Sequence, residues 1–343
     1  MALILGLESS CDDSAAALVA SDRRILAQAV IGQDDIHRPF GGVVPEIAAR
    51  AHVERLPDLI RHVLEKANVK PSDLDAVAAT AGPGLIGGVM VALLAGKGLA
   101  LAAGKPLVAV NHLEGHALSP RLADPDLAFP YLLLLASGGH CQLLEVRGVG
   151  DYRRLATTID DAAGEAFDKA AKLLGLSYPG GPAIEALARE GDPKAVSLPR
   201  PLFGSAEPHF SFAGLKSAVQ RAAVSGAHRP ADIAASFQQA VVDCLLDRTA
   251  RALASHDAPT LVVAGGVAAN GAVRSALADL AHRHERAFSV PPGWLCTDNA
   301  AMIGWAGAER FAAGLTDPLD APARARWPLD VEADKVRGAG VKA

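Results

Sequence analysis

The chain has 343 residues, of which 50% are hydrophobic, 21% are charged and 4% are aromatic. This length predicts two domains, and the balance of apolar and charged residues excludes an intrinsically disordered chain. The net charge of −5 argues against strong, autonomous binding to nucleic acid, although it leaves room for a local basic patch or a basic partner.

Hydrophobic periodicity predicts two runs of elements in nearly the same order. The first run is three strands, a helix, a strand, a helix and a strand, at residues 3–7, 15–20, 25–30, 45–67, 76–81, 87–103 and 107–110. The second run is three strands and a helix at 131–136, 142–146, 152–157 and 161–174, a Gly/Pro loop to residue 182 and an insertion loop at 193–212, then helices at 214–225 and 231–254, a strand at 260–264, a helix at 270–284 and a strand near 287–290.

This repeated order predicts an α/β protein of two similar lobes with a central cleft. We assign residues 1–111 and about 299–325 to the first lobe, because a last helix at 299–313 is expected to pack back on it. Residues 112–298 form the expected second lobe, and 326–343 an irregular tail.

The remaining compositional features concern the compartment. The four cysteines form no CxxC pair, which is typical of free thiols in a reducing compartment. Residues 1–7 are apolar but lack a basic flank, so we interpret them as a buried strand rather than a signal peptide. The uncharged stretch 76–96 is long enough to cross a bilayer, but Gly82-Pro83-Gly84 and Gly87-Gly88 interrupt it, which favours a strand, a turn and a helix. We expect a cytoplasmic protein with no membrane partner.

Asn111-His112-Leu113-Glu114-Gly115-His116 carries two histidines four residues apart, directly after an expected buried strand. On a helix both imidazoles then lie on one face and can reach one cation. The alternative is a surface or capping role for both. Glu114 lies two residues from each histidine, about 200° around the helix, so it is badly placed as the base of a zinc peptidase of the HExxH type.

Asp298 is the candidate for a third ligand. It lies where a helix is expected to begin after a Pro/Gly loop. With the two histidines it would form a two-His-one-carboxylate set with open positions, which suits iron(II) and also zinc. The alternative is a helix N-cap, because Asp and Asn are favoured at that position.

Three turns of small or polar residues follow apolar strands, at residues 8–13, 137–140 and 265–270. Such turns allow close backbone approach, and their N–H groups can bind phosphate. The first two lie at equivalent points of the repeated pattern, and the third opens a helix. This arrangement resembles the actin/Hsp70/sugar-kinase (ASKHA) nucleotide fold, in which paired hairpins grip the phosphates and a later GG turn lies against the adenosine.

Several motifs, in this order, resemble the TsaD/YgjD family of tRNA adenosine threonylcarbamoyltransferases, once labelled O-sialoglycoprotein endopeptidases. They are GLESSCDDSAAAL, NHLEGHALS, LLLLASGGHCQL, DDAAGEAFDKAAKLLGLSYPGGP, FSFAGLKSAV, AGGVAAN and CTDNAAMIG. The resemblance runs from about Leu3 to Gly314. It implies an ASKHA fold and transfer of a threonylcarbamoyl group from threonylcarbamoyl-adenylate to the N6 amine of the adenosine 3′ of the anticodon (position 37) in tRNAs reading ANN codons, with release of AMP.

The resemblance also implies site residues and partners. One divalent metal, iron(II) in first place with zinc or magnesium as alternatives, would be bound by His112, His116 and Asp298. Substrate contacts would come from Leu135, Ala136, Ser137, Gly138 and Gly139 on the phosphate side, and from Asp168, Gly181, Glu185 and Asn270 around the adenosine and ribose. Besides the adenylate and tRNA, the expected partners are a TsaB-like paralogue and a TsaE-like ATPase in one complex.

The chemistry of such a transfer needs few protein groups. The mixed anhydride of the donor is already activated, so the enzyme must orient it, polarise the carbamoyl carbonyl and accommodate the leaving phosphate. The aromatic amine of the acceptor is weakly basic, so a nearby base would help. Asp12 is the first candidate for this base and Glu8 the second, with hairpin polarity and capping as the alternative for both.

Two further questions stay open at this point. A metallopeptidase and an ASKHA-type nucleotide-binding scaffold without transfer activity are the alternative functions, although Glu114 is badly spaced for the first and the second has no need of HxxxH. His37, Arg38, Arg50 and Arg55 could form a local RNA-facing rim or a solvated helix face.

Overall fold

The computed structural model describes residues 1–40, 42–334 and 336. The chain divides into two compact units. Unit 1 comprises Met1–Leu127, Gly148–Asp151 and Thr297–Val331. Unit 2 comprises Ala128–Arg147, Tyr152–Cys296 and the described part of Glu332–Ala343. The central cleft expected from the sequence remains a prediction.

Unit 1 is built on a five-stranded sheet of order β3-β2-β1-β4-β5. The strands are β1 (Leu3–Glu8), β2 (Ser14–Ala20), β3 (Ile25–Ile31), β4 (Ala76–Gly82) and β5 (Leu107–Asn111). The first three are antiparallel neighbours, and β4 and β5 run parallel to β1. The short elements α1 (Asp34–His37), η1 (Arg38–Phe40) and η2 (Pro71–Asp73) lie in its connections.

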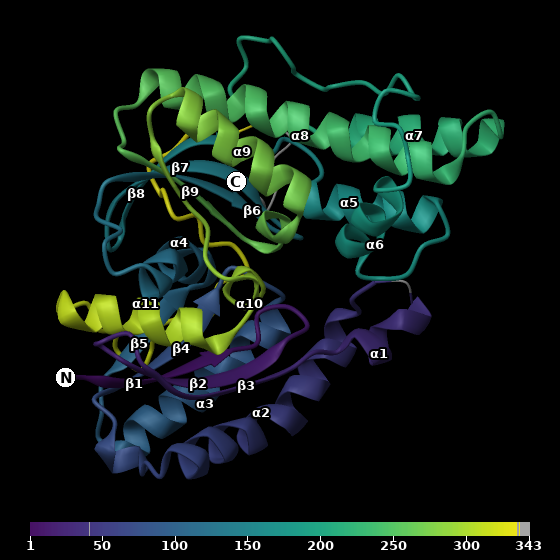
Figure 1. Cartoon of the computed structure of the whole chain (residues 1–343). Helices are drawn as coiled ribbons and strands as arrows, with labels where there is room; N and C mark the ends of the chain where they lie inside the picture. Colours follow the sequence, from purple (N-terminus) through teal and green to yellow (C-terminus); the bar gives the residue numbers. More distant parts are fainter. Residues whose placement is uncertain (41, 335, 337–343) are drawn as a thin grey trace. The chain divides into compact units, whose positions relative to one another are not determined.

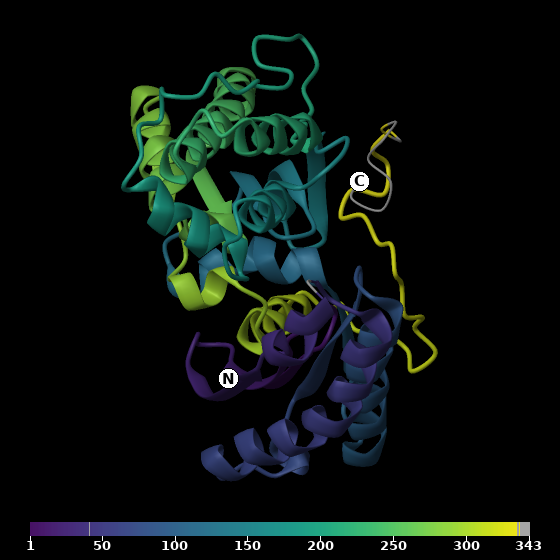
Figure 2. The same ribbon diagram turned by 90° about the vertical axis from the view of Figure 1, so that its right-hand side faces the viewer.

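Helices cover both faces of this sheet, α2 (Pro45–Ala67) and α3 (Ile86–Ala103) on one and α11 (Ala300–Ala312) on the other (Figure 1; Figure 2 shows the same layers from the side). Successive residues of β1 face different layers. Leu5 and Leu7 belong to the core shared with α2 and α3. Gly6 faces α11 so closely that a Cβ there would collide with the carbonyl oxygen of Ala300. The last helix therefore packs on the first sheet, as predicted.

Helix α4 (His112–Ala123) begins directly after β5 and packs against α11. A Cβ on Gly115 would lie 2.8 Å from Cδ1 of Ile303, so the two helices approach closely at this glycine. Because of this packing α4 groups with unit 1, whereas we expected the residues from 112 onward to belong to the second lobe.

Unit 2 is built on a second sheet of order β10-β9-β6-β7-β8. Its strands are β6 (Tyr131–Ala136), β7 (Cys141–Gly148), β8 (Asp151–Thr157), β9 (Thr260–Ala264) and β10 (Ala287–Ser289). The strands of each unit can be numbered first to fifth along the chain. If the second sheet is then read from β8 to β10, both sheets have the order third, second, first, fourth, fifth. In both, the second strand is antiparallel and the fourth parallel to the first. The predicted duplication is therefore confirmed.

The helices of unit 2 enclose its core with the sheet. They are α5 (Ala163–Leu173), α6 (Gly180–Ala188), α7 (Ala213–Ser225), α8 (Pro230–Ser255), η3 (Gly266–Ala269), α9 (Gly271–Arg283) and α10 (Gly293–Cys296). The stretch 193–212 contains no helix or strand, as expected. The prediction of a Gly/Pro loop through residue 182 is wrong at its end, because α6 begins at Gly180. Pro182 is tolerated in its first turn, where a missing N–H costs no helical hydrogen bond.

Helix α3 is the one described helix that is long and apolar enough to cross a membrane by length and composition. Its Val89, Ala92 and Leu93 are buried in the core with the first sheet, as in the predicted strand, turn and helix. Beyond α11 the described chain forms no helix or strand through Asp334, as predicted for the tail. Residues 335 and 337–343 of that predicted tail lie outside the described residues.

Candidate metal centre and phosphate turns

The start of α4 places two histidines side by side. Strand β5 ends at Asn111, whose Oδ1 accepts a hydrogen bond from the Leu113 N–H at 2.9 Å and so caps the helix. His112 is then the first helical residue and His116 lies one turn later, with their ring centroids 4.8 Å apart. Both rings are buried. The prediction that they share one helix face is confirmed.

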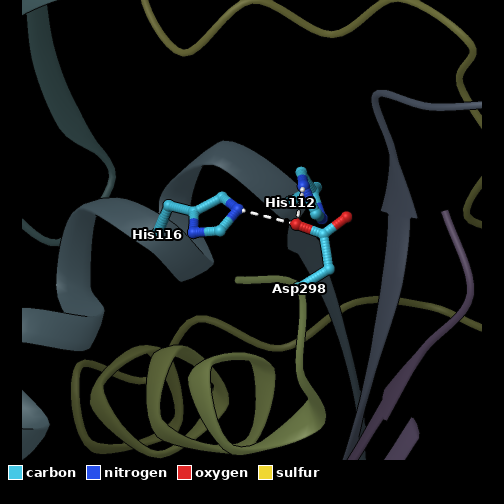
Figure 3. Close-up of side chains that lie close together, drawn as sticks. All are labelled: His112, His116 and Asp298. Atoms are coloured by element: carbon cyan, nitrogen blue, oxygen red, sulfur yellow. Dashed lines mark hydrogen bonds and ion pairs between the residues drawn. The ribbon is translucent and has the colours of Figure 1, made fainter. Parts of the chain in front are cut away.

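Asp298 supplies the third group of this cluster (Figure 3). Its Oδ1 lies 3.1 Å from Nε2 of His116 and 3.5 Å from Nε2 of His112. The alternative role of Asp298 as the N-cap of α11 is wrong. The cap is Asn299, whose Oδ1 accepts a hydrogen bond from the Met302 N–H at 2.9 Å.

Glu8 fixes the orientation of His112. Its Oε2 lies 2.9 Å from Nδ1 of His112 and accepts a hydrogen bond from the Thr80 hydroxyl at 2.7 Å. Its Oε1 accepts from the Ser10 N–H at 2.5 Å. A metal-binding histidine commonly has its other ring nitrogen held by a carboxylate in this way. His112, His116 and Asp298 together form a triad. Their donor atoms lie within 4.8 Å of one another, so these residues fit a divalent metal.

The two histidines differ in the partners of their Nδ1 atoms: Nδ1 of His112 faces Glu8. Among the described residues the buried Nδ1 of His116 has no hydrogen-bond partner. Burial lowers the pKa of His112, but Asp298 and Glu8 outweigh it and raise that pKa to about 9. Burial likewise raises the pKa of Glu8, and the neighbouring His112 reverses this and lowers it. These opposite shifts favour an ion pair between His112 and Glu8, and metal binding is linked to proton release because a metal-binding imidazole is neutral.

Glu114 points away from the triad, as its spacing predicted. The carboxylate is buried, accepts a hydrogen bond from the Gly150 N–H at 3.0 Å and pairs with Nη1 of Arg310 at 3.1 Å. Its oxygens are thus occupied by structural contacts. This geometry counts against a peptidase in which Glu114 activates water.

The β1–β2 turn carries three acidic residues in different settings. Glu8, the second candidate for the base, is fully buried and occupied in orienting His112. Asp12, the first candidate, is half-buried, and burial with the nearby Asp298 raises its pKa. Burial, Asp298 and Asp12 raise the pKa of the neighbouring Asp13 to about 7. We did not single out Asp13 from the sequence, although its adjacency to Asp12 was visible.

A buried polar network supports the β1–β2 turn. Nε2 of His52 lies 3.1 Å from the Cys11 carbonyl oxygen, which can only accept, so neutral His52 carries its proton on Nε2. Its Nδ1 then accepts from the Ser14 hydroxyl at 2.7 Å and from Nε2 of Gln33 at 3.2 Å. Oε1 of Gln33 in turn accepts from Nε2 of His37 at 3.1 Å. His37 is therefore buried in unit 1, so it fits neither the RNA-facing rim nor the solvated helix face considered for it.

The β6–β7 turn of unit 2 places Ser137, Gly138 and Gly139 before His140, with open space around the two glycines. The Ser137 N–H donates to the His140 carbonyl at 2.8 Å, and the His140 N–H donates to the Ser137 hydroxyl at 3.1 Å. Within the described part of the chain, the N–H groups of Gly138 and Gly139 have no acceptor, and a Cβ on either glycine would meet no atom within 4 Å. Such a turn suits an anion.

The GG turn after β9 lies beside this turn, because β6 and β9 are parallel neighbours. Gly265 has a φ of +89°, and a Cβ there would collide with the Ala136 carbonyl. The side chains of Leu135 and Ala136 are fully buried, so any substrate contact on this strand falls to the backbone and to the turn.

The other predicted substrate residues of unit 2 lie in two pairs. Oδ1 of Asp168 accepts from the Gly180 N–H at 2.8 Å, next to the open Gly181. Oε1 of Glu185 accepts from the Gly271 N–H at 3.0 Å, next to Asn270. Asn270 also caps α9 by accepting from the Val273 N–H at 3.0 Å. In each pair the carboxylate therefore binds the N–H of the residue next to its partner, at the start of a helix.

The TsaD family, described as tRNA N6-adenosine threonylcarbamoyltransferase, matches residues 24–305. The chain belongs to the TsaD family. A protein of this name from Sphingopyxis alaskensis is 75% identical over 344 residues, covering 100% of both chains. One from Novosphingobium aromaticivorans is 69% identical over 350 residues, again covering 100% of both. The predicted family, function and enzyme class, a tRNA-modifying transferase, are confirmed.

The fold of this TsaD-family chain is shared by more distant proteins. Component A of the (R)-2-hydroxyglutaryl-CoA dehydratase of Acidaminococcus fermentans has a TM-score of 0.55 at 17% identity, covering 91% of this chain and 100% of that one. At this identity the similarity shows the fold alone. Together with the duplicated sheet order it confirms the predicted ASKHA-type fold.

Proposed function

We propose that this chain transfers a threonylcarbamoyl group from threonylcarbamoyl-adenylate to N6 of adenosine 37 in tRNAs that read ANN codons, with release of AMP. The observation that carries the proposal is the triad of His112, His116 and Asp298, with Glu8 holding the first imidazole. A nucleotide-binding scaffold without transfer activity has no use for such a triad.

The two units have separate tasks in this reaction. A divalent metal at the triad, iron(II) in first place with zinc or magnesium as alternatives, would polarise substrate oxygens as a Lewis acid. The N–H groups of Gly138 and Gly139 bind the phosphate of the adenylate, and this phosphate later departs as part of AMP. Asp168, Gly181, Glu185 and Asn270 surround its adenosine and ribose.

A carboxylate of the β1–β2 turn accepts the proton of the tRNA amine. As the N6 nitrogen attacks the carbamoyl carbon, the bond to the phosphate oxygen breaks and the nitrogen loses a proton. Asp12 remains our first candidate for this base, and Asp13 is added beside it. Burial and Asp298 bring their pKa values closer to neutrality, which suits a general base.

The chain works in the cytoplasm with further proteins. Its net charge of −5 gives tRNA little general attraction, so partners that help to hold the RNA are expected. A TsaB-like paralogue and a TsaE-like ATPase are the partners that we propose.

The test is single-turnover formation of modified adenosine from preformed adenylate and tRNA, scored by nucleoside mass spectrometry, with a protease assay on an unfolded protein alongside. Glu114→Gln should change transfer by less than about tenfold, or about 1.4 kcal/mol, because its carboxylate does not face the triad. Asp12→Asn should reduce transfer far more, with the metal retained, and Asp13→Asn shows which of the two neighbours is the base. If Glu114→Gln removed both activities while Asp12→Asn was harmless, the peptidase would be the better proposal.

A further inference from the structure

Unit 2 contains a pocket of about 460 Å³ that none of the predicted substrate residues lines. It lies between β8, the C-terminal half of α8 and the loop residues 206–208. Four of its twelve lining residues are arginines, namely Arg153, Arg154, Arg248 and Arg251, and none is a carboxylate. We call it the arginine pocket. This concentration of positive charge contrasts with the net charge of −5 of the whole chain.

Two of the four arginines are used by the protein itself. The side chain of Arg248 is only 2% exposed and pairs with Asp247, and it donates to the carbonyl groups of Leu202 and Ser205. Arg154 donates to the carbonyl of Asp334. These contacts shape the wall of the arginine pocket, so neither guanidinium is the natural first contact of a ligand.

Arg153 and Arg251 are the cations that a ligand can reach. Arg153 is exposed on β8 and has no hydrogen bond or ion pair among the residues that the structure describes. The side chain of Arg251 is 44% exposed, and its ion pair with Asp247 is long, at 3.6 Å. Asp247 is closely paired with Arg248, so it neutralises Arg251 only in part.

The chemistry of the lining selects the ligand. Planar guanidinium groups bind phosphate oxygens in a bidentate manner. Leu143, Leu155 and Ala156 contribute apolar surface, and the lining has no Phe, Tyr or Trp on which a splayed base could stack. Its one aromatic ring is the imidazole of His256, whose Nδ1 lies 2.9 Å from the Ser255 hydroxyl. Contacts of this kind bind the sugar–phosphate backbone and carry no sequence information.

We propose that the arginine pocket binds the phosphate backbone of the tRNA substrate through Arg153 and Arg251. The inference rests on the proposed function, since tRNA must be the acceptor. It gives a chain of acidic net charge a local site for RNA.

The test compares two double variants that each remove two positive charges from unit 2. Arg153→Gln with Arg251→Gln alters the pocket, and Arg221→Gln with Arg283→Gln is the control, on exposed positions of α7 and α9. Affinity for tRNA is measured between 50 and 200 mM salt, roughly the range over which phosphate contacts weaken, in the assembly that supports transfer. The pocket variant should bind tRNA about tenfold more weakly at low salt. The slope of the logarithm of the binding constant against the logarithm of the salt concentration should be smaller in magnitude by about 2, one for each lost contact. Its KM for tRNA should rise while kcat and bound metal stay at the parent values.

Equal affinities of the pocket and control variants would overturn the assignment, provided that the parent modifies tRNA. If the parent neither binds nor modifies tRNA, the proposed function itself fails and this inference falls with it. A calorimetric titration with inorganic pyrophosphate separates RNA from a free anion. Loss of pyrophosphate binding in the pocket variant with tRNA affinity unchanged would assign the pocket to a small anion and reject the RNA site.

Discussion

The β1–β2 turn of unit 1 and the β6–β7 turn of unit 2 occupy equivalent places in two sheets of the same strand order. In unit 1 the turn is acidic, and its groups are tied to the protein: Glu8 holds His112 and the Cys11 carbonyl is held by His52. In unit 2 the turn has no carboxylate, and Gly138 and Gly139 border open space. One topology thus carries two different chemistries.

The difference shows what a duplicated fold leaves free to vary. The strand order requires only that the first two strands be joined by a short turn, because the core lies under the strands and not under the turn. The turn residues can therefore form part of a cation site in one unit and of an anion site in the other. Substitutions in one turn should leave the function of the other intact.

The largest effect is expected at the triad. His112→Ala should lower metal affinity by more than about 100-fold, since losing even a supporting residue of such a site costs 10–100-fold. Asp298→Ala should act in the same direction. Metal per chain, measured by elemental analysis after dialysis, checks this, with His62→Ala on the exposed side of α2 as the control. Full metal content in both triad variants would remove the basis for a cation site in unit 1.

The next effect concerns the turn of unit 2. Gly138→Val should weaken binding of AMP, used as the probe, by about tenfold or more, because a side chain blocks the approach of phosphate to the backbone. The fold should be unaffected, since the added Cβ meets no protein atom. Calorimetry measures the affinity, and Gly42→Val, another glycine in open space, is the control in unit 1. Unchanged AMP affinity, or a loss of metal, would break the division of tasks between the turns.

A smaller effect is expected from the network behind the turn of unit 1. Burial lowers the pKa of His52 below its usual 6.5, so neutral His52 stabilises the fold above that pH. As the pH falls through 6.5, the unfolded chain takes up the proton first, and the free energy of unfolding falls by at most about 1.4 kcal/mol per pH unit.

Denaturant titrations between about pH 7.5 and 5 measure this dependence, a range set on both sides of the ordinary histidine pKa. His52→Gln keeps a polar side chain but cannot titrate, so the stability difference between parent and variant should shrink toward acid pH. His62→Gln, at an exposed position, should leave the profile unchanged. A constant difference across the range would mean that His52 does not titrate differently in the folded chain.

The smallest effect separates two adjacent residues. Asn299→Ala should lower the free energy of unfolding by about 1 kcal/mol through the lost cap of α11, with metal content unchanged. Asp298→Ala should do the reverse and lose metal without this loss of capping. Chemical denaturation together with elemental analysis measures both. The opposite pattern would return Asp298 to the role of a cap.

The order of the elements was predictable, because hydrophobic periodicity reports local geometry. The same holds for His112 and His116, since residues four apart on a helix share a face wherever that helix packs. Helix α6 was missed because Gly180 and Pro182 look like loop residues, and the hydrogen bond from the Gly180 N–H to Asp168 is invisible in the sequence.

The sequence by itself determined the family, the repeated α/β order and the pair of histidines, because motifs and helical spacing are local properties. Tertiary structure decided which of two good capping residues, Asp298 or Asn299, turns toward His116, 182 positions away in the chain. It also decided that Glu8 supports a histidine, that His37 is buried, and that Arg153 and Arg251 line one pocket. Each of these outcomes depends on contacts between distant segments, and no local pattern encodes them.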